Sequence, residues 1–205
     1  MSIGITDKER DAIKEMANIG AGKAAGYLNQ MFESHVALSI PDVEFIENDG
    51  RHDVSAMLGI TEEPCSSVTM GFTGDFTGKT VLAFKQDDAR RLADTLVNGL
   101  SSKEELDALT KSAFSEMGNI VINSVVGSIS NILGTRVDFS IPSYTTGNLR
   151  DTVGDCPPGC ESVPLTVIVH THFCVQKVQA QGYLFLLVET GRFAERLATL
   201  AIPND

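Results

Sequence analysis

Two short polar motifs, Glu15-x-x-Asn18 and Glu116-x-x-Asn119, have the residue types and the spacing to do chemistry. Residues three apart share one face of a helix, so each motif would place a carboxylate beside a carboxamide. A carboxamide oxygen can accept a hydrogen bond from a water, and its nitrogen can donate to an oxyanion. An exposed carboxylate can pair with a lysine of a docked protein. This equipment favours hydrolysis of an already activated phosphoryl group, in which positioning and electrostatics dominate.

The two motifs are part of a longer internal repeat. Two of the repeated segments are 101 residues apart and the third pair is 105 residues apart. Matches in the same order at nearly constant spacing predict a duplication, with repeats at 1–100 and 101–205 that form one domain. The three segments are Glu15-Met-Ala-Asn-Ile, which recurs from Glu116, Ser39-Ile-Pro, which recurs from Ser140, and Arg91-Leu-Ala, which recurs from Arg196.

A long amphipathic helix is predicted at the start of each repeat. Apolar residues recur every three or four positions from about Asp7 to Met31, and again in the second repeat up to Gly134. Thr6 followed by Glu9 is a capping-box spacing, which predicts that the first helix begins there. The predicted core-facing residues are Ile13, Met16, Ala17, Gly20, Ala24, Tyr27, Leu28 and Met31, and in the second helix Phe114, Met117, Val121, Val125, Ile129 and Ile132.

Strands and a closing helix are predicted after each long helix. The first strand runs into Ser-Ile-Pro, where proline is expected to end the ladder pairing, and two strands joined by a turn follow. The fold class is therefore α+β, or α/β in a looser vocabulary, with two pseudo-symmetric repeats that share one mostly antiparallel sheet. The predicted strands are 35–40, 68–72 and 79–85, then 136–141, 165–175 and 179–188; the closing helices are 87–96 and 191–200, and residues 148–161 form the main irregular loop.

The faces opposite the predicted core carry the two motifs and are unusual for exposed helix faces, because they lack lysine and contain small residues that another surface could approach closely. In one copy alone, a Glu and an Asn one turn apart are usually just solvated. Their presence at equivalent exposed positions of both copies shifts the balance towards a functional site. These faces consist of Asp11, Glu15, Asn18, Gly22, Ala25, Gly26 and Asn29, and of Ser112, Glu116, Asn119, Asn123, Gly127 and Ser130.

Composition restricts the classes of partner. The chain has 205 residues, of which 42% are hydrophobic and 21% charged, as is usual for a globular protein. Its formal charge of −11 disfavours nucleic acid and anionic membranes as partners. We see no signal peptide and no apolar run long enough for a transmembrane helix. Four irregularly spaced cysteines indicate a reduced, cytoplasmic protein rather than a disulfide framework.

Other candidate sites are weaker. His170, His172 and Cys174 alternate along one strand with a spacing that zinc could use, but no fourth ligand is evident and a structural role is favoured. Cys156 and Cys160 have a three-residue spacer and no thioredoxin-like context. The two motif glutamates could in principle act as a glycosidase pair, yet no aromatic platform accompanies them. The sequence has neither a Walker loop nor Gly-x-Ser-x-Gly.

The two motifs, in the extended forms Asp11-x-x-x-Glu-x-x-Asn-Ile-Gly-Ala-Gly22 and Ser112-x-x-x-Glu-x-x-Asn119, resemble the signature helices of CheC-type chemotaxis phosphatases of the CheC/CheX/FliY family. The resemblance extends over essentially the whole chain and includes the strand into Ser-Ile-Pro. It implies an enzyme that dephosphorylates the phospho-aspartate of the chemotaxis response regulator CheY. It also implies association with the receptor deamidase CheD, for which no residues can be assigned.

The resemblance implies roles for individual residues. Glu15 and Glu116 would form salt bridges to the active-site lysine of the regulator, and Asn18 and Asn119 would orient the attacking water. The magnesium would belong to the regulator, and this chain would supply no metal ligand or other cofactor. The supporting or docking residues would be Asp11, Gly22, Ser112 and Asn123.

One departure from the family pattern is visible. Ile-Gly-Ala-Gly follows Asn18, whereas bulkier Ile-Val-Ile-Asn follows Asn119, which bears on docking at the second motif. A rival hypothesis from another class is a binding module that holds CheY or CheD without catalysis, or a flagellar-switch-like module. Because both motifs are present, the enzyme hypothesis is favoured.

Overall fold

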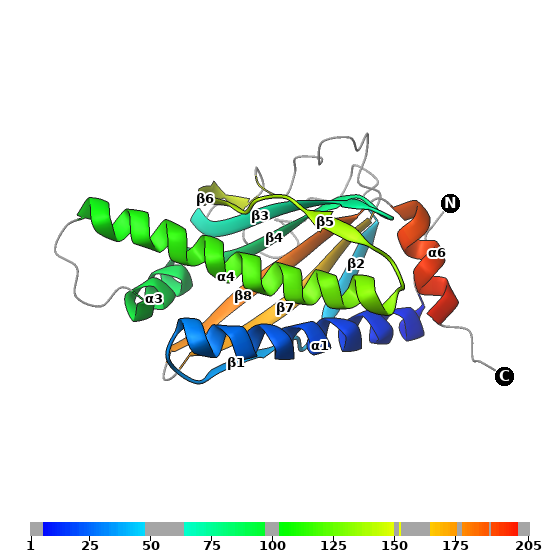
Figure 1. Cartoon of the computed structure of the whole chain (residues 1–205), viewed down its shortest axis with the longest axis horizontal. Helices are drawn as coiled ribbons and strands as arrows, with labels where there is room; N and C mark the ends of the chain where they lie inside the picture. The colour runs from blue at the N-terminus through cyan, green and yellow to red at the C-terminus, as the bar shows by residue number, and fades with distance from the viewer. Residues whose placement is uncertain are drawn as a thin grey trace.

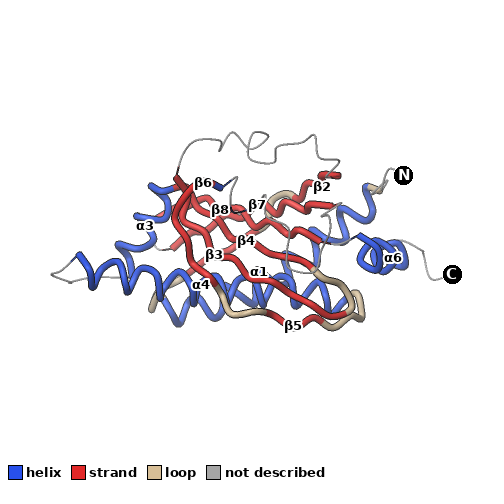
Figure 2. Tube along the Cα trace, turned by 90° about the horizontal axis from the view of Figure 1, so that it is seen from above, coloured by secondary structure: helices blue, strands red, loops and turns tan. Residues whose placement is uncertain are grey.

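The fold is one curved sheet with two long helices across one of its faces (Figure 1). The computed structural model describes residues 6–47, 64–96, 103–149, 152, 165–175, 178–188 and 190–200. Helices α1 (Asp7–Met31) and α4 (Lys103–Ile132) both lie on the same side of the sheet, as the view from above also shows (Figure 2). The shorter helices α3 (Gln86–Leu96) and α6 (Thr190–Leu200) follow the last strand of each half.

Eight strands form the sheet in the part of the chain that the structure describes, and every pairing between them is antiparallel. The order is β1-β7-β8-β4-β3-β5, with β2 also paired to β7 and β6 also paired to β3. The predicted class, mixed helix and strand with one mostly antiparallel sheet, is confirmed. The strands are β1 (Val36–Ser39), β2 (Val43–Glu47), β3 (Pro64–Gly74), β4 (Gly78–Lys85), β5 (Val137–Phe139), β6 (Ser143–Asn148), β7 (Leu165–Val175) and β8 (Val178–Val188).

The strand order has a two-fold pattern. The counterparts of β1, β2, β3 and β4 are β5, β6, β7 and β8. Exchanging each strand with its counterpart gives the order β5-β3-β4-β8-β7-β1, which is the observed order read from the opposite edge of the sheet. The first two strands of each half pair with the third strand of the other half, and β4 pairs with β8 at the centre. Each half therefore completes the sheet of the other. The evolutionary duplication itself stays a prediction.

Strands β2 and β6 were missing from the sequence-based prediction. Proline at the end of Ser-Ile-Pro was expected to end the pairing, but after Pro41 and Pro142 the chain returns to the sheet. Proline removes one N–H donor at its own position only, so the residues that follow can pair again. In β2 they pair with β7, and in β6 they pair with β3.

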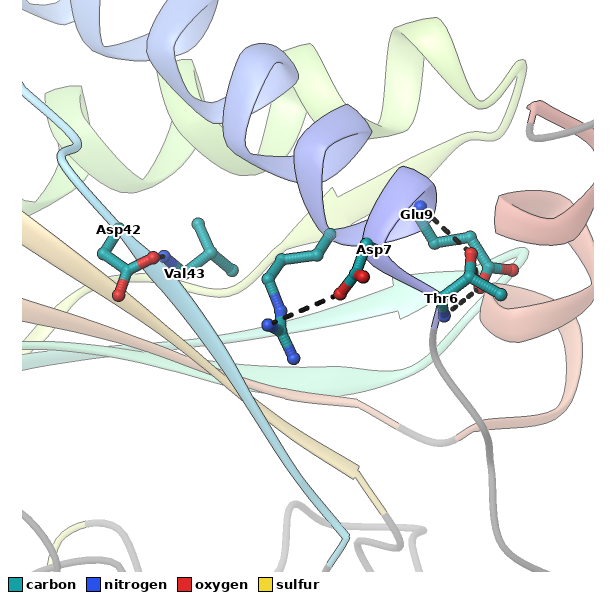
Figure 3. A network of polar contacts seen from close by, with 6 residues as sticks. Thr6, Asp7, Glu9, Asp42 and Val43 are labelled. Atoms are coloured by element: carbon teal, nitrogen blue, oxygen red, sulfur yellow. Dashed lines mark hydrogen bonds and ion pairs between the residues drawn. The ribbon is translucent and has the colours of Figure 1, made fainter.

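The first long helix begins and ends where the sequence predicted. The Thr6 hydroxyl accepts from the N–H of Glu9 at 3.3 Å, and the Glu9 carboxylate accepts from the N–H of Thr6 at 2.7 Å (Figure 3). This is the predicted capping box, and it satisfies N–H groups that have no partner within the helix. Asp7 and Arg10 form an exposed ion pair beside it.

The helix faces also follow the predicted pattern, with three exceptions. Tyr27 is 61% exposed and Ile132 is 42% exposed, so neither belongs to the core. Tyr27 lies near the end of α1, where this helix diverges from α4 (Figure 1), and Ile132 is the last residue of its helix. Ser130, expected on the polar face, is buried, and its hydroxyl is satisfied there by donating to the carbonyl of Thr135 at 2.8 Å.

Candidate functional site

Helices α1 and α4 run antiparallel and pack against each other through a glycine. A Cβ on Gly20 would lie 2.5 Å from the carbonyl oxygen of Ser124 and 2.5 Å from Cα of Val125, so only glycine allows this close approach. The Lys23 ammonium adds a hydrogen bond to the Ser128 hydroxyl at 3.2 Å. The faces of α1 and α4 that are turned away from the sheet are covered by no other described element (Figure 1). These faces are called the outer ridges of the two helices.

Both predicted glutamates lie on these outer ridges. Glu15 on α1 and Glu116 on α4 are exposed, and neither carboxylate has a hydrogen-bond or ion-pair partner among the described residues. Asp11, Gly22 and Ser112 are exposed as well. At Gly22 an added Cβ would meet nothing within 4 Å, so the surface there is open. The glutamates are therefore free to pair with a group on another molecule.

Asn18 is not the free side chain that the sequence predicted. It is half-buried, and its Oδ1 accepts from the N–H of Ile40 at 3.0 Å. Its Nδ2 donates to the carbonyl of Ile40 and to the carbonyl of Lys14, each at 3.0 Å. Because a carboxamide has two N–H donors, both donors of Asn18 are occupied. Only one acceptor position of its oxygen remains for a water.

Asn119, the equivalent residue of the second motif, has a different set of partners. Its Oδ1 accepts from Nδ2 of Asn123 at 2.7 Å, and the same Nδ2 is 2.9 Å from the backbone carbonyl of Asn119. No described residue accepts a hydrogen bond from Nδ2 of Asn119, which is half-exposed. Asn119 can therefore donate to an oxyanion and accept from a water with its remaining acceptor position, as the predicted chemistry requires.

The sequence-based prediction missed the contact between Ile40 and the first motif. Ser39-Ile40-Pro41 was interpreted as the end of a strand, whereas the structure places the Ile40 backbone against Asn18. The signal was present, because Ser-Ile-Pro is repeated at the same 101-residue offset as the motifs. In the second half the equivalent Ile141 is 88% exposed. The two motifs are thus alike in sequence and different in surroundings.

The histidine and cysteine candidates do not form a metal site in the part of the chain that the structure describes, where no three His, Cys, Asp or Glu side chains gather to hold an ion. His170 on β7 instead contacts the Glu44 carboxylate on β2 at 2.7 Å, which is a structural pairing of an edge strand. Cys156 and Cys160 lie outside the described residues. Within the described residues, no helix is both long and apolar enough to cross a membrane.

Two grooves in the described part of the chain are lined by residues other than those of the motifs. A groove of about 840 Å³ is lined by residues of β1, α3, β7 and β8, among them Asp88, Arg91 and His172. A second, of about 740 Å³, lies between α3, α4, β3 and β6. Neither includes Glu15, Asn18, Glu116 or Asn119. A reactive site on an open helix ridge suits a protein substrate that brings its own concave site.

Sequence comparisons point to one group of proteins. A family model described as chemotaxis phosphatase CheX matches residues 66–160, which contain the second motif. The chain is 25% identical over 191 residues to a putative CheY-P phosphatase CheC1 of Halobacterium salinarum, which covers 92% of this chain and 95% of that protein. It is 28% identical over 140 residues to the flagellar motor switch phosphatase FliY of Bacillus subtilis, covering 67% of this chain and 35% of FliY. The chain thus spans about a third of that FliY.

Structural comparisons show the same fold. The crystal structure of Thermotoga maritima FliY superposes with a TM-score of 0.70 at 22% identity, covering 96% of both chains. A chain of the CheX–CheY–BeF3–Mg²⁺ complex of Borrelia burgdorferi superposes with a TM-score of 0.50 at 15% identity, covering 85% of this chain and 96% of that one. At such identities the similarity establishes the fold.

Proposed function

Because this chain is similar in sequence and in fold to chemotaxis phosphatases of the CheC, CheX and FliY type, we propose that it belongs with them and hydrolyses the phospho-aspartate of a CheY-type response regulator. The observation that carries the proposal is that each of the helices α1 and α4 presents an exposed motif glutamate, one turn before a partly exposed asparagine, outside the two grooves described above. A phosphorylated regulator is a large substrate that would lie across such a ridge.

The glutamates would dock the substrate. Glu15 and Glu116 are exposed carboxylates without partners among the described residues, and each would form an ion pair with the active-site lysine of a regulator. Asp11, Gly22, Ser112 and Asn123 would lie in or beside the contact. An ion pair at this position would align the phospho-aspartate with the asparagine one helical turn further along.

The asparagines would position the water. Asn18 or Asn119 would hold a water with its carboxamide oxygen and donate an N–H to a phosphoryl oxygen. The water would attack phosphorus, the bond between phosphorus and the aspartyl oxygen would break, and inorganic phosphate and the aspartate carboxylate would be released. The Mg²⁺ would be held by the regulator and would stabilise the charge that develops on the phosphoryl oxygens.

The same docking defines the partners and the place of action. One known CheX has been crystallised with CheY bearing BeF3 and Mg²⁺, and we propose a comparable encounter here. A phosphorylated regulator is found in the cytoplasm, so we place the protein there. CheD remains a proposed partner without an assigned surface.

A second candidate function is a binding module that holds the regulator or CheD without turnover, or a module of the flagellar switch. One observation favours it: both N–H groups of Asn18 are used by backbone carbonyls, so the first site has no free donor. A relative that covers part of this chain is a flagellar motor switch phosphatase, and its name combines the two roles.

Phosphate release from purified phosphorylated CheY, measured with and without this protein, tests the proposal. We expect acceleration above the regulator's own rate, reduced to that rate when Asn18 and Asn119 are both replaced by Ala. Helicity from circular dichroism serves as the folding control. If the double variant accelerates release as well as the natural protein does, these asparagines are not catalytic and the binding-module hypothesis is supported.

A further inference from the structure

The two motifs differ most in what orients their carboxamides. We propose that Asn123 is a positioning residue that turns the N–H groups of Asn119 outwards, which makes the second motif the one arranged for catalysis before a substrate binds. This inference rests on the proposed phosphatase function. It concerns the orientation of one side chain, so it can be tested by spectroscopy as well as by kinetics.

The orientation of Asn119 follows from the donors and acceptors around it. Oxygen and nitrogen of a carboxamide are distinguished by their partners. The atom of Asn123 that lies 2.9 Å from the carbonyl oxygen of Asn119 must be the donor Nδ2. The same Nδ2 is 2.7 Å from the Asn119 side chain, so the atom that it meets there must be the acceptor Oδ1. Nδ2 of Asn119 therefore points away from Asn123.

The same reasoning fixes the orientation of the Asn18 carboxamide, whose N–H groups are directed at backbone carbonyls. The backbone N–H of Ile40 requires an acceptor and its carbonyl requires a donor, so Oδ1 and Nδ2 of Asn18 cannot exchange places. With a second donation to Lys14, the Asn18 amide has no N–H left for a phosphoryl oxygen. Catalysis there requires that Asn18 first give up a bond to a backbone carbonyl, which costs free energy.

The residue four positions after the motif asparagine differs between the two halves. Asn123 lies four residues after Asn119, one helical turn along, where its side chain can reach back. The residue 101 positions earlier, four after Asn18, is Gly22, which has no side chain to offer. The first motif therefore lacks a side chain that could compete with Ile40 for Asn18. The second has one, and Ile141 is exposed.

The kinetic test isolates the second motif by Glu15→Lys, which reverses the charge of an exposed side chain that has no partner among the described residues. In this background Asn123→Ala should lower kcat about five- to tenfold and leave KM unchanged. A loss of this size corresponds to one hydrogen bond that stabilises the transition state. Asn123→Gln, which keeps an amide donor, should restore part of kcat. Asn131→Ala, the same replacement at an exposed position of α4, is the matched control and should change neither constant.

The spectroscopic test does not depend on activity. With ¹⁵N-labelled asparagine, the side-chain amide signals of Asn119 should shift and broaden in Asn123→Ala, while those of Asn18 stay unchanged. In the natural protein, the Asn18 amide protons should exchange with solvent more slowly than those of Asn119. Unaltered Asn119 signals, equal exchange at the two residues, or an effect of Asn123→Ala on KM alone would each overturn the inference. If the Glu15→Lys protein is folded but inactive, the phosphatase function of the second motif fails, and the amide spectra alone decide the orientation of Asn119.

Discussion

The side chain of Asn18 pairs with the backbone of Ile40 as a neighbouring strand would, with Oδ1 3.0 Å from the amide nitrogen and Nδ2 3.0 Å from the carbonyl oxygen. Asn29, further along α1, accepts from the N–H of Val36 at 2.6 Å. Helix α1 thus holds β1 at both ends through two asparagines. Asn18 has a structural role that its equivalent Asn119 does not share, because no bond joins Asn119 to Ile141 among the described residues.

Replacing Asn18 should therefore cost more stability than replacing Asn119, whereas replacing Asn119 should cost more activity. Asn18→Ala leaves both backbone groups of the buried Ile40 without partners and should lower the free energy of unfolding by about 2 kcal/mol. Asn119→Ala removes one half-exposed contact and should cost less than about 1 kcal/mol, yet reduce kcat more. Urea unfolding followed by circular dichroism, together with phosphate release, measures both. Equal losses of stability would contradict the role of Asn18 described here.

The glutamates should affect binding more than turnover. Glu15→Gln combined with Glu116→Gln should raise KM and weaken its dependence on salt, because an ion pair across an exposed interface is screened by ions. We expect kcat to be largely kept, unlike in Asn119→Ala. Asp94→Asn, which removes one exposed negative charge from α3, is the control for a general charge effect. If the glutamine and alanine variants share one kinetic signature, the proposed division of labour is wrong.

Two glycines of α1, Gly20 and Gly22, are two residues apart and so lie on roughly opposite sides of the helix, and they should respond differently to alanine. Gly20→Ala would push a methyl group to 2.5 Å from the backbone of α4 and should destabilise the protein by about 2 kcal/mol or more. Gly22→Ala meets open space and should stabilise α1 by up to about 1 kcal/mol, since alanine is the better helix former. Thermal unfolding of the two variants checks this. Similar melting temperatures would contradict the close approach of the helices.

The binding surface can be tested at Gly22 as well. Gly22→Gln should weaken the complex with BeF3-activated CheY, because a long side chain would stand where the regulator is proposed to lie. The fold should be unaffected, as no atom lies within 4 Å of the added Cβ. Calorimetric titration measures the affinity, and the melting temperature serves as the control. Unchanged affinity with an unchanged melting temperature would remove Gly22 from the docking surface.

Local interactions account for what the sequence by itself determined. The capping box of Thr6 and Glu9, the buried positions of α1 and α4, and the exposure of Glu15 and Glu116 all depend on residues within a turn or two of one another. Such patterns are visible in a linear sequence because helix geometry repeats every 3.6 residues. The bond from Asn123 to Asn119 is of the same local kind, although the sequence suggested only a docking role for Asn123.

Only the tertiary structure decided the features that join distant segments. Strands β2 and β6 form because each pairs with a strand of the other half of the chain, β7 and β3 respectively. No pattern in the neighbouring residues predicts this pairing. Asn18 and Ile40 are 22 residues apart, and their contact depends on how β1 folds back along α1. Two motifs with the same Glu-x-x-Asn sequence therefore differ in the hydrogen-bonding state of their amides. The packing of the chain decides that state, because it brings the backbone of Ile40 to Asn18 and the side chain of Asn123 to Asn119.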